Sequence, residues 1–235
     1  TRVLRYFKNH FGAELFNSAS HPLIGVVNFG ARLNNALYSR DKNIIVFGSG
    51  DGINYRNFAL STDIVAHEII HAISYKYVQF RNVGESGSLN EFFSDFFAKM
   101  ITGSEGEWKF GADLIADGAK ASAVRDLIDP EKFGSPATND SPLRIPTDQP
   151  CTPSNNQCGI HINNSIPSRA AALITESIGR DKAERLFFFV LTHRMRPSSD
   201  FREFRIQTEK SCRFLFGTSA YDCVRVKRAF DIVRI

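Results

Sequence analysis

An α+β fold is predicted for this chain, with a small β-containing part first and a larger, mainly α-helical part after it. Strand-like stretches lie near 23–29 and 43–47, whereas the pattern from Thr62 onward is helical. The 235 residues fit one large domain or two closely packed lobes. Hydrophobic residues at 43% and charged residues at 23% are ordinary for a soluble globular protein.

The elements follow in order along the chain. A helix is expected over 2–9, and GSGDG at 48–52 has the composition of a turn. The next helix has Ser61, Thr62 or Asp63 as its candidate N-cap. Further helices are expected over 88–100, 166–178, 181–195, 200–216 and 220–234. These elements predict a β-containing lobe (1–62), a central helix (63–80) and an α-helical lobe (81–235).

Charge and hydropathy exclude several classes of function. The net charge of +4 is mild, and the arginines of the last third are interleaved with acids on predicted helices, which favours a solvated face over a nucleic-acid or membrane patch. The densest apolar run, LFFFVL, is far too short to cross a bilayer. We therefore expect no nucleic-acid partner and no membrane span.

The four cysteines form two local pairs. Cys151 and Cys158 bracket a turn-rich stretch inside a long loop expected over 103–160, and Cys212 and Cys223 flank the connection between the last two helices. Loops that long are usually functional or braced. An even count in loop-closing positions favours disulfides and an oxidising compartment. Four free thiols in a cytosolic protein are the alternative.

The HEIIH stretch indicates half of a zinc site. On a helix, His67 and His71 lie four residues apart on one face and can bind one ion. Glu68 points about 100° away from His67 and can reach a bound water instead of the metal. Glu91 is a candidate third ligand, and Asp95, one turn later, can fix the tautomer of a ligand histidine. Each of these residues alone would more often be ordinary helix surface.

Together with GESGSLNEFFSDFFA and GIHINNSIPSRAA, the HEIIHAIS stretch resembles the consecutive signatures of the thermolysin-like neutral metallopeptidases. The resemblance continues through NNALY, FGSGDG and the C-terminal end, so it covers nearly the whole chain. It implies a thermolysin-like fold with the cleft between two lobes. In that family a sizeable β-rich region precedes the point matching Thr1, and we expect it to be absent or carried on a segment cleaved away or not supplied.

The resemblance also implies roles for individual residues. The positions that match the family's zinc ligands are His67, His71 and Glu91, and Glu68 matches its general base. Asp95 matches the acid that hydrogen-bonds to a ligand histidine, and Asn90 is similarly placed to orient His71. His161 matches the histidine that stabilises the oxyanion, and Arg125 the arginine that holds a substrate carbonyl. Asn35 and Ala36 match the edge strand that binds the substrate backbone. The expected specificity pocket is lined by Tyr55, Phe58, Ile64, Phe110, Leu114 and Val124.

The sequence departs from the family at the oxyanion site. Asn82 stands where the family usually has a tyrosine donor, and Asn156 replaces the aspartate behind His161. Asn156 can still accept from His161 but cannot stabilise an imidazolium as a carboxylate does. Tyr75 and Tyr77 are near in sequence but are not expected in the cleft. We expect a slower peptidase, or one tuned to lower pH.

The family's calcium site is expected to be absent or weak. Lys99 and Lys109 occupy positions where calcium ligands or acids are usual. One of these lysines is expected to replace the ion by pairing with Asp63 or Glu107; lysines pointing to solvent are the alternative.

We therefore expect a secreted or periplasmic zinc endopeptidase, a monomer, that cleaves protein or peptide substrates before hydrophobic residues. A pro-segment is compatible with the resemblance. One rival is a zinc-binding module that binds peptides or a partner with little turnover, favoured by Asn82 and Asn156 but not by Glu68. The other is a zinc aminopeptidase, for which no G-x-M-E-N-like segment is visible.

Overall fold

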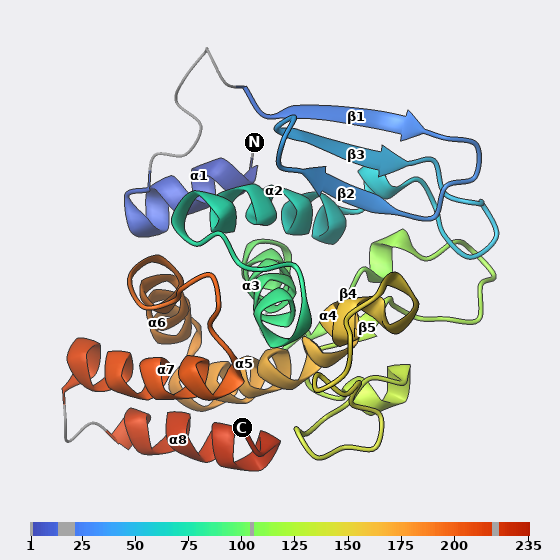
Figure 1. Cartoon of the computed structure of the whole chain (residues 1–235). Helices are drawn as coiled ribbons and strands as arrows, with labels where there is room; N and C mark the ends of the chain where they lie inside the picture. The colour runs from blue at the N-terminus through green and yellow to red at the C-terminus, as the bar shows by residue number, and fades with distance from the viewer. Residues whose placement is uncertain (1, 14–21, 104–105, 218–220) are drawn as a thin grey trace.

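The computed structural model describes residues 2–13, 22–103, 106–217 and 221–235. Helix α2 (Thr62–Tyr77) runs between two unequal parts: a three-stranded sheet and α1 (Arg2–Phe11) lie on one side of it, and α3 (Gly84–Thr102) lies on the other (Figure 1). The remaining helices are α4 (Asn156–Asn163), α5 (Ser165–Ile178), α6 (Arg180–His193), α7 (Phe201–Phe216) and α8 (Tyr221–Val233). The predicted α+β class is confirmed.

The sheet has the strand order β1-β3-β2, with β1 (Ile24–Phe29) parallel and β2 (Ala36–Ser39) antiparallel to the central β3 (Ile44–Gly48). Among the described residues β2 pairs only with β3, so its other edge has no strand partner there, and this strand lies next to α2 (Figure 1). A short second sheet joins β4 (Lys109–Phe110) to β5 (Arg125–Asp126).

Helix α2 begins at one of the three N-caps that the sequence suggested. The Ser61 hydroxyl accepts a hydrogen bond from the Ile64 N–H at 3.3 Å, and the Asp113 carboxylate accepts from the Thr62 N–H at 2.7 Å. Two of the free N–H groups at the helix start are thereby satisfied, and a carboxylate lies at the positive end of the helix dipole. These contacts fix the start of the helix that carries HEIIH.

Two departures from the sequence-based expectation bear on the candidate site. Helix α3 begins at Gly84, four residues before the expected start, and it includes Gly87, where the lack of a side chain lets α4 come close: a Cβ there would lie 2.5 Å from Cγ2 of Ile160. Helix α4 lies in the segment expected to be a loop. Its first four residues, Asn156 to Gly159, have positive φ angles, so no helical pattern was visible.

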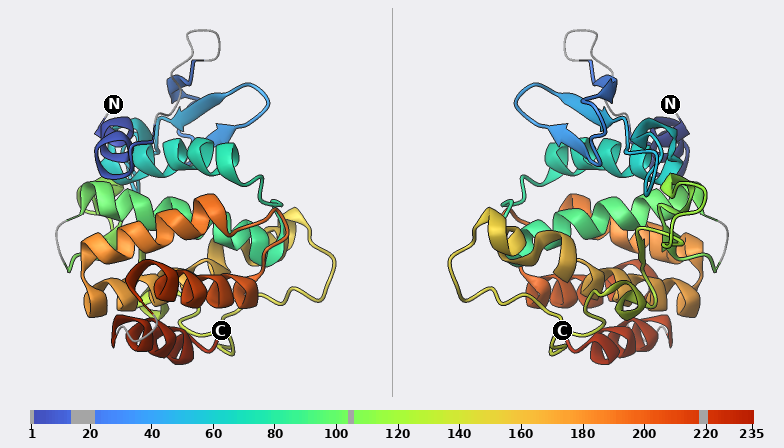
Figure 2. Two further views of the ribbon diagram at one scale, coloured as in Figure 1. Left: turned by 90° about the vertical axis from the view of Figure 1, so that its left-hand side faces the viewer. Right: turned by 90° about the vertical axis from the view of Figure 1, so that its right-hand side faces the viewer.

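The core centres on α3, which other elements surround on every side (Figure 2). Phe92, Phe93, Phe96 and Phe97 are fully buried on this helix, and Phe187 of α6 packs edge-on against two of them. Almost all residues of this helix are buried, the polar ones included, so neighbouring elements cover all of its faces. Helix α3 is therefore a rigid support for the polar side chains that it directs toward α2. Over the described residues, every helix is too short or too polar to traverse a bilayer.

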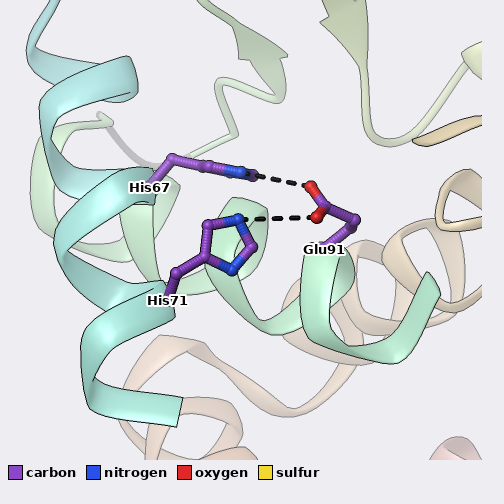
Figure 3. Close-up of side chains that lie close together, drawn as sticks. All are labelled: His67, His71 and Glu91. Carbon is purple, nitrogen blue, oxygen red and sulfur yellow. Dashed lines mark ion pairs between the residues drawn. The ribbon is translucent and has the colours of Figure 1, made fainter. Parts of the chain in front are cut away.

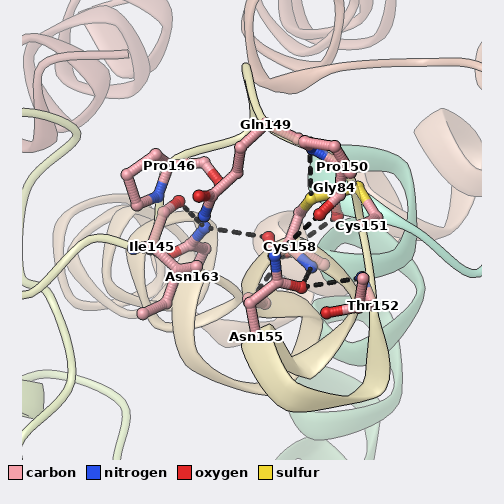
Figure 4. The surroundings of a disulfide bond; sticks show 12 residues. Gly84, Ile145, Pro146, Gln149, Pro150, Cys151, Thr152, Asn155, Cys158 and Asn163 are labelled. Carbon is pink, nitrogen blue, oxygen red and sulfur yellow. Dashed lines mark hydrogen bonds between the residues drawn. A yellow bond between two sulfur atoms is a disulfide. The ribbon is translucent and has the colours of Figure 1, made fainter.

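Both predicted cysteine pairs form disulfides, Cys151–Cys158 and Cys212–Cys223. The first closes the loop that leads into α4 (Figure 4). Within this loop the Asn155 side chain accepts from the N–H groups of Thr152 and Cys158, each at 2.9 Å. The bridge and these contacts fix the start of α4, which carries His161. The connection bridged by Cys212 and Cys223 includes residues 218–220, which lie outside the described ranges.

Candidate metal centre and cleft

Helices α2 and α3 bring three of the predicted ligands together. Nε2 of His67 lies 3.2 Å from Oε2 of Glu91, and Nε2 of His71 lies 3.5 Å from Oε1 of the same carboxylate (Figure 3). All three side chains are buried, and their ligand atoms lie within 4.8 Å of one another. The four-residue spacing on α2 turns both rings toward α3, as a shared ion requires.

The outer nitrogens of both rings are held by α3. Nδ1 of His67 lies 2.8 Å from Oδ1 of Asp95, and Nδ1 of His71 lies 3.0 Å from Oγ of Ser94. Asp95 also accepts from Arg125 at 2.9 Å and from Asn164 at 2.8 Å, so its own position is fixed. Contacts of this kind keep the inner nitrogens pointed at a metal.

The expectation that Asn90 orients His71 is wrong. Oδ1 of Asn90 accepts from the Ser74 hydroxyl at 2.5 Å, and Ser94 reaches the His71 ring instead. The reason is helical phase: Ser94 lies three residues after Glu91 and shares its face, whereas Asn90 is turned away by about 100°.

The cluster is electrostatically suited to a cation. Burial opposes a charge on His67, but its hydrogen bonds to Asp95 and Glu91 overcome that penalty and raise the pKa of His67 to about 10. Burial likewise opposes ionisation of Glu91, yet His71 and His161 hold the pKa of this carboxyl well below its usual range. Two imidazole nitrogens and one carboxylate oxygen fit zinc, and three protein ligands leave a further position open.

Glu68 lies in the same cleft but outside the ligand group. Its side chain is buried, and Oε2 has no hydrogen-bond partner among the residues that the structure describes. Burial raises the pKa of Glu68, an effect that the neighbouring His67 and His71 oppose. A buried carboxylate oxygen without a partner is costly to keep, and such groups occur where a water or substrate is handled.

The cleft has a volume of about 380 Å³ and lies between the β2 edge, α2 and α4. Of the residues expected to bind substrate, the lining contains Asn35, Ala36, Tyr55, Phe58, Ile64, Leu114, Val124 and Arg125. Phe110 does not line it: its fully buried ring lies beneath Arg125, whose guanidinium carbon is 4.6 Å from the ring centroid. Phe110 therefore supports Arg125 and is not part of the pocket wall.

His161 reaches the metal centre from α4. Its Nε2 lies 3.7 Å from Oε1 of Glu91, and its side chain remains half exposed to the cleft. The Asn156 amide nitrogen lies 3.0 Å from Nδ1 of His161, while the amide oxygen accepts from the His161 backbone N–H at 2.8 Å. The expectation that Asn156 accepts from the ring is therefore wrong: its oxygen is occupied, and its nitrogen can only donate.

Two family models together match nearly the whole chain. Residues 1–74 match the thermolysin metallopeptidase, catalytic domain, and residues 79–235 match the thermolysin metallopeptidase, alpha-helical domain. The chain belongs to the thermolysin metallopeptidase family. The resemblance inferred from its motifs is thereby confirmed.

Curated relatives of this thermolysin-family chain include proteins named bacillolysin, thermolysin and extracellular elastase. Bacillolysin of Bacillus caldolyticus is 27% identical over 246 residues, covering 99% of this chain and 43% of the relative. Extracellular elastase of Staphylococcus epidermidis is 31% identical over 235 residues, covering 98% of this chain and 44% of the relative. The chain thus spans less than half the length of these relatives.

Among solved structures, the precursor of protealysin, a metalloproteinase from Serratia proteamaculans, matches with a TM-score of 0.83 at 23% identity. The match covers 99% of this chain and 74% of that one, and it confirms the thermolysin-like fold.

One cleft residue of this thermolysin-family chain was not expected there. Tyr75 lines the cleft together with His71, Asn82 and Glu91, whereas Tyr77 does not. The signal was present in the sequence, because Tyr75 follows His71 by four residues and so shares its face of α2. Ser94 was missed as well, although its spacing of three from Glu91 carried the same information.

Proposed function

We propose that this chain is a zinc-dependent endopeptidase that hydrolyses peptide bonds in proteins or peptides. The observation that carries the proposal is the unpartnered carboxylate oxygen of Glu68, buried in the cleft beside three converging ligand atoms. A module that only bound zinc and a partner would have no use for this costly arrangement. That difference favours the peptidase over the binding module.

The residues divide the chemical work among them. A zinc ion held by His67, His71 and Glu91 would polarise the scissile carbonyl and acidify a water molecule. Glu68 accepts the proton of that water and delivers it to the leaving amine, and its raised pKa suits both steps. His161 donates from Nε2 to the oxygen on which negative charge develops.

Arg125 is proposed to hold a carbonyl group of the substrate. Its Nη2 donates to Asp95 and its guanidinium lies over Phe110, while its buried Nε has no partner. The arginine is therefore fixed in place and retains a free N–H donor. The same carboxylate, Asp95, therefore contacts both Arg125 and His67 and links the proposed substrate-binding arginine to the metal centre.

The substrate backbone is proposed to bind along β2. This strand is open on one edge, and its residues Ala36, Leu37 and Tyr38 line the cleft. An extended peptide can pair with such an edge through main-chain hydrogen bonds. The neighbouring wall, formed by Phe58, Ile64, Leu114 and Val124, is apolar and is proposed to select a hydrophobic residue directly after the cleaved bond, aliphatic more than aromatic.

Calcium is proposed to be unnecessary at the position where the family usually binds it. Nζ of Lys99 lies 3.6 Å from Oδ2 of Asp63, and both side chains are buried. Asp63 also accepts from the Gly111 N–H at 2.8 Å and from the Thr102 hydroxyl. The ammonium group of Lys99 therefore supplies positive charge beside this carboxylate. Lys109 and Glu107 are both exposed and do not take this role.

Secretion or a periplasmic location is proposed from the two disulfides and from relatives such as the extracellular elastase. We propose a monomer acting on protein or peptide substrates. The protealysin structure is that of a precursor, which supports the proposal that a pro-segment also accompanies this chain in its full-length form.

The test is cleavage of a quenched peptide library by the zinc-loaded chain and by Glu68→Gln, with zinc content measured for both. We expect cleavage before apolar residues by the wild type and a loss on the order of 10²- to 10⁴-fold in the variant at equal zinc content. Equal inertness of two zinc-loaded proteins would instead support the binding module.

A further inference from the structure

We propose, on the basis of the peptidase function above, that the Tyr75 hydroxyl is a catalytic hydrogen-bond donor of this cleft. It would contact the substrate oxygen that becomes negatively charged during hydrolysis, as a partner to His161. The residue comes from α2 and His161 from α4, so the two donors would approach that oxygen from different elements.

The first support is the position of Tyr75 beside the metal centre. It follows the ligand His71 by one helical turn and lines the same cleft as Glu68, Glu91 and His161. The oxygen of a bound peptide that faces the metal centre must lie in this cleft. Tyr75 therefore occupies part of the wall that a reacting carbonyl group faces.

The second support is that the ring of Tyr75 is held in place. The guanidinium carbon of Arg40 lies 5.3 Å from its ring centroid, and the Tyr38 ring lies 5.9 Å from it. Nη2 of Arg40 in turn donates to Oε1 of Gln79 at 2.6 Å. A donor contributes most to catalysis when its position is set before the reaction, as it is here.

The third support is that the Tyr75 hydroxyl has no hydrogen-bond partner among the described residues. The hydroxyl of the neighbouring Tyr38, in contrast, donates to Oδ1 of Asn43 at 3.1 Å. Burial raises the pKa of Tyr75; the Arg40 guanidinium opposes this effect and the Glu91 carboxylate adds to it, so the phenol keeps its proton throughout the neutral range. Tyr75 thus offers a free O–H, and hydrogen bonds of this type strengthen when the acceptor becomes charged.

Asn82 is the competing donor. It also lines the cleft, but its side chain is exposed to solvent, where an amide has water as an alternative partner. A solvated amide on the rim is less pre-organised than a partly buried phenol whose ring contacts Arg40 and Tyr38. We therefore assign the donor role to Tyr75, and the experiment includes both residues.

The test uses a peptide phosphonamidate, whose tetrahedral phosphorus mimics the transition state, and the corresponding peptide substrate. Calorimetry gives the phosphonamidate Kd for the zinc-loaded wild type, Tyr75→Phe, Asn82→Ala and Tyr77→Phe, and cleavage gives kcat and KM. Tyr77→Phe is the matched control, because Tyr77 lies two residues later on α2 and does not line the cleft. Zinc content is measured for each protein.

For Tyr75→Phe we expect phosphonamidate binding to weaken about a hundredfold and kcat to fall by a similar factor, with KM and zinc content nearly unchanged. Asn82→Ala and Tyr77→Phe should stay close to the wild type. If Tyr75→Phe raised KM alone, Tyr75 would only form part of the cleft wall, and the assignment would be overturned. A loss of kcat and phosphonamidate affinity confined to Asn82→Ala would also overturn it. Wild-type protein that cleaves no peptide at all would instead overturn the peptidase function.

Discussion

The amide nitrogen of Asn156 donates to Nδ1 of His161 across 3.0 Å, because the amide oxygen is already bonded to the His161 backbone N–H. Nδ1 therefore accepts, and neutral His161 carries its proton on Nε2, the nitrogen that faces Glu91. An aspartate at position 156 could only accept from the ring. It would require a proton on Nδ1 and favour the imidazolium form.

We predict that Asn156→Asp changes the protonation state of His161. In the wild type, ¹⁵N NMR at neutral pH should show the neutral Nε2–H tautomer; in the variant it should show a larger cationic fraction, because a carboxylate close to the ring raises the pKa of His161. An Nδ1–H tautomer in the wild-type spectrum would contradict the donor role of Asn156. Asn155→Asp, in the same loop but without a contact to the ring, serves as a control for charge alone.

The Lys99–Asp63 pair predicts a stability that does not depend on calcium. A calcium-selective chelator should leave the thermal unfolding midpoint unchanged. Lys99→Met should lower the free energy of unfolding by about 3–5 kcal/mol, since it leaves the Asp63 charge buried without its cation. The double variant Lys99→Met/Asp63→Asn should recover part of this loss. The control is Lys109→Met, at an exposed position, which should change the free energy of unfolding by less than about 0.5 kcal/mol. A large fall in the midpoint on chelation would refute the replacement.

Zinc binding is predicted to release the proton that His67 holds in the metal-free chain. The pKa of His67 is about 10 in the folded chain, against about 6.5 for an unperturbed histidine. A raised pKa stabilises the metal-free fold fully below about pH 6.5, and this contribution is lost as pH rises toward 10. Zinc competes with the same proton, so its apparent affinity should rise up to about tenfold per pH unit across that window.

Calorimetric titrations with zinc in two buffers of different ionisation enthalpy should therefore report close to one proton released at pH 7.5. Asp95→Asn removes the carboxylate that holds Nδ1 of His67, and zinc affinity should fall on the order of 10- to 100-fold. A pH-independent affinity between pH 6.5 and 8.5 would show that His67 is already neutral.

The parts of the site that the sequence revealed are those that depend on short spacing within one helix. His67 and His71 share a face because they are one turn apart, and Glu68 is turned away from that face. The same rule, applied further along α2 and α3, would have found Tyr75 and Ser94. The family resemblance assigns no role to either residue, so only helical phase could have indicated them.

Other features could not be derived from sequence because they depend on contacts between distant segments. The Asn156 side chain donates to the His161 ring because its oxygen accepts from the His161 backbone N–H. That N–H lies close to Asn156 because Gln157, Cys158 and Gly159 have left-handed backbone conformations. The choice of Lys99 over Lys109 depends on which side chain is buried beside Asp63. The role of Gly87 depends on its contact with Ile160, because the lack of a side chain lets α3 and α4 come close.

Gly87 provides the last prediction, because it links packing to the position of His161. A Cβ at this position would lie 2.5 Å from Cγ2 of Ile160, the residue before His161. Gly87→Ala should push α4 away from α3, with a loss of about 1–3 kcal/mol in the free energy of unfolding. A shift of His161 by about 1 Å relative to Glu91 should lower kcat on the order of a hundredfold.

Zinc content should stay at the wild-type level in Gly87→Ala, because His67, His71 and Glu91 lie on α2 and α3 and do not depend on α4. Adding Ile160→Leu removes the obstructing methyl group from Cβ and should restore much of the lost kcat. Gly25→Ala is the matched control, since the nearest atom to its added Cβ is Cε2 of Phe47 at 3.9 Å, an ordinary contact. A Gly87→Ala variant that lost stability but kept the wild-type kcat would contradict this prediction. In that case the packing of α4 against α3 does not position His161, and the Cys151–Cys158 loop must hold His161 instead.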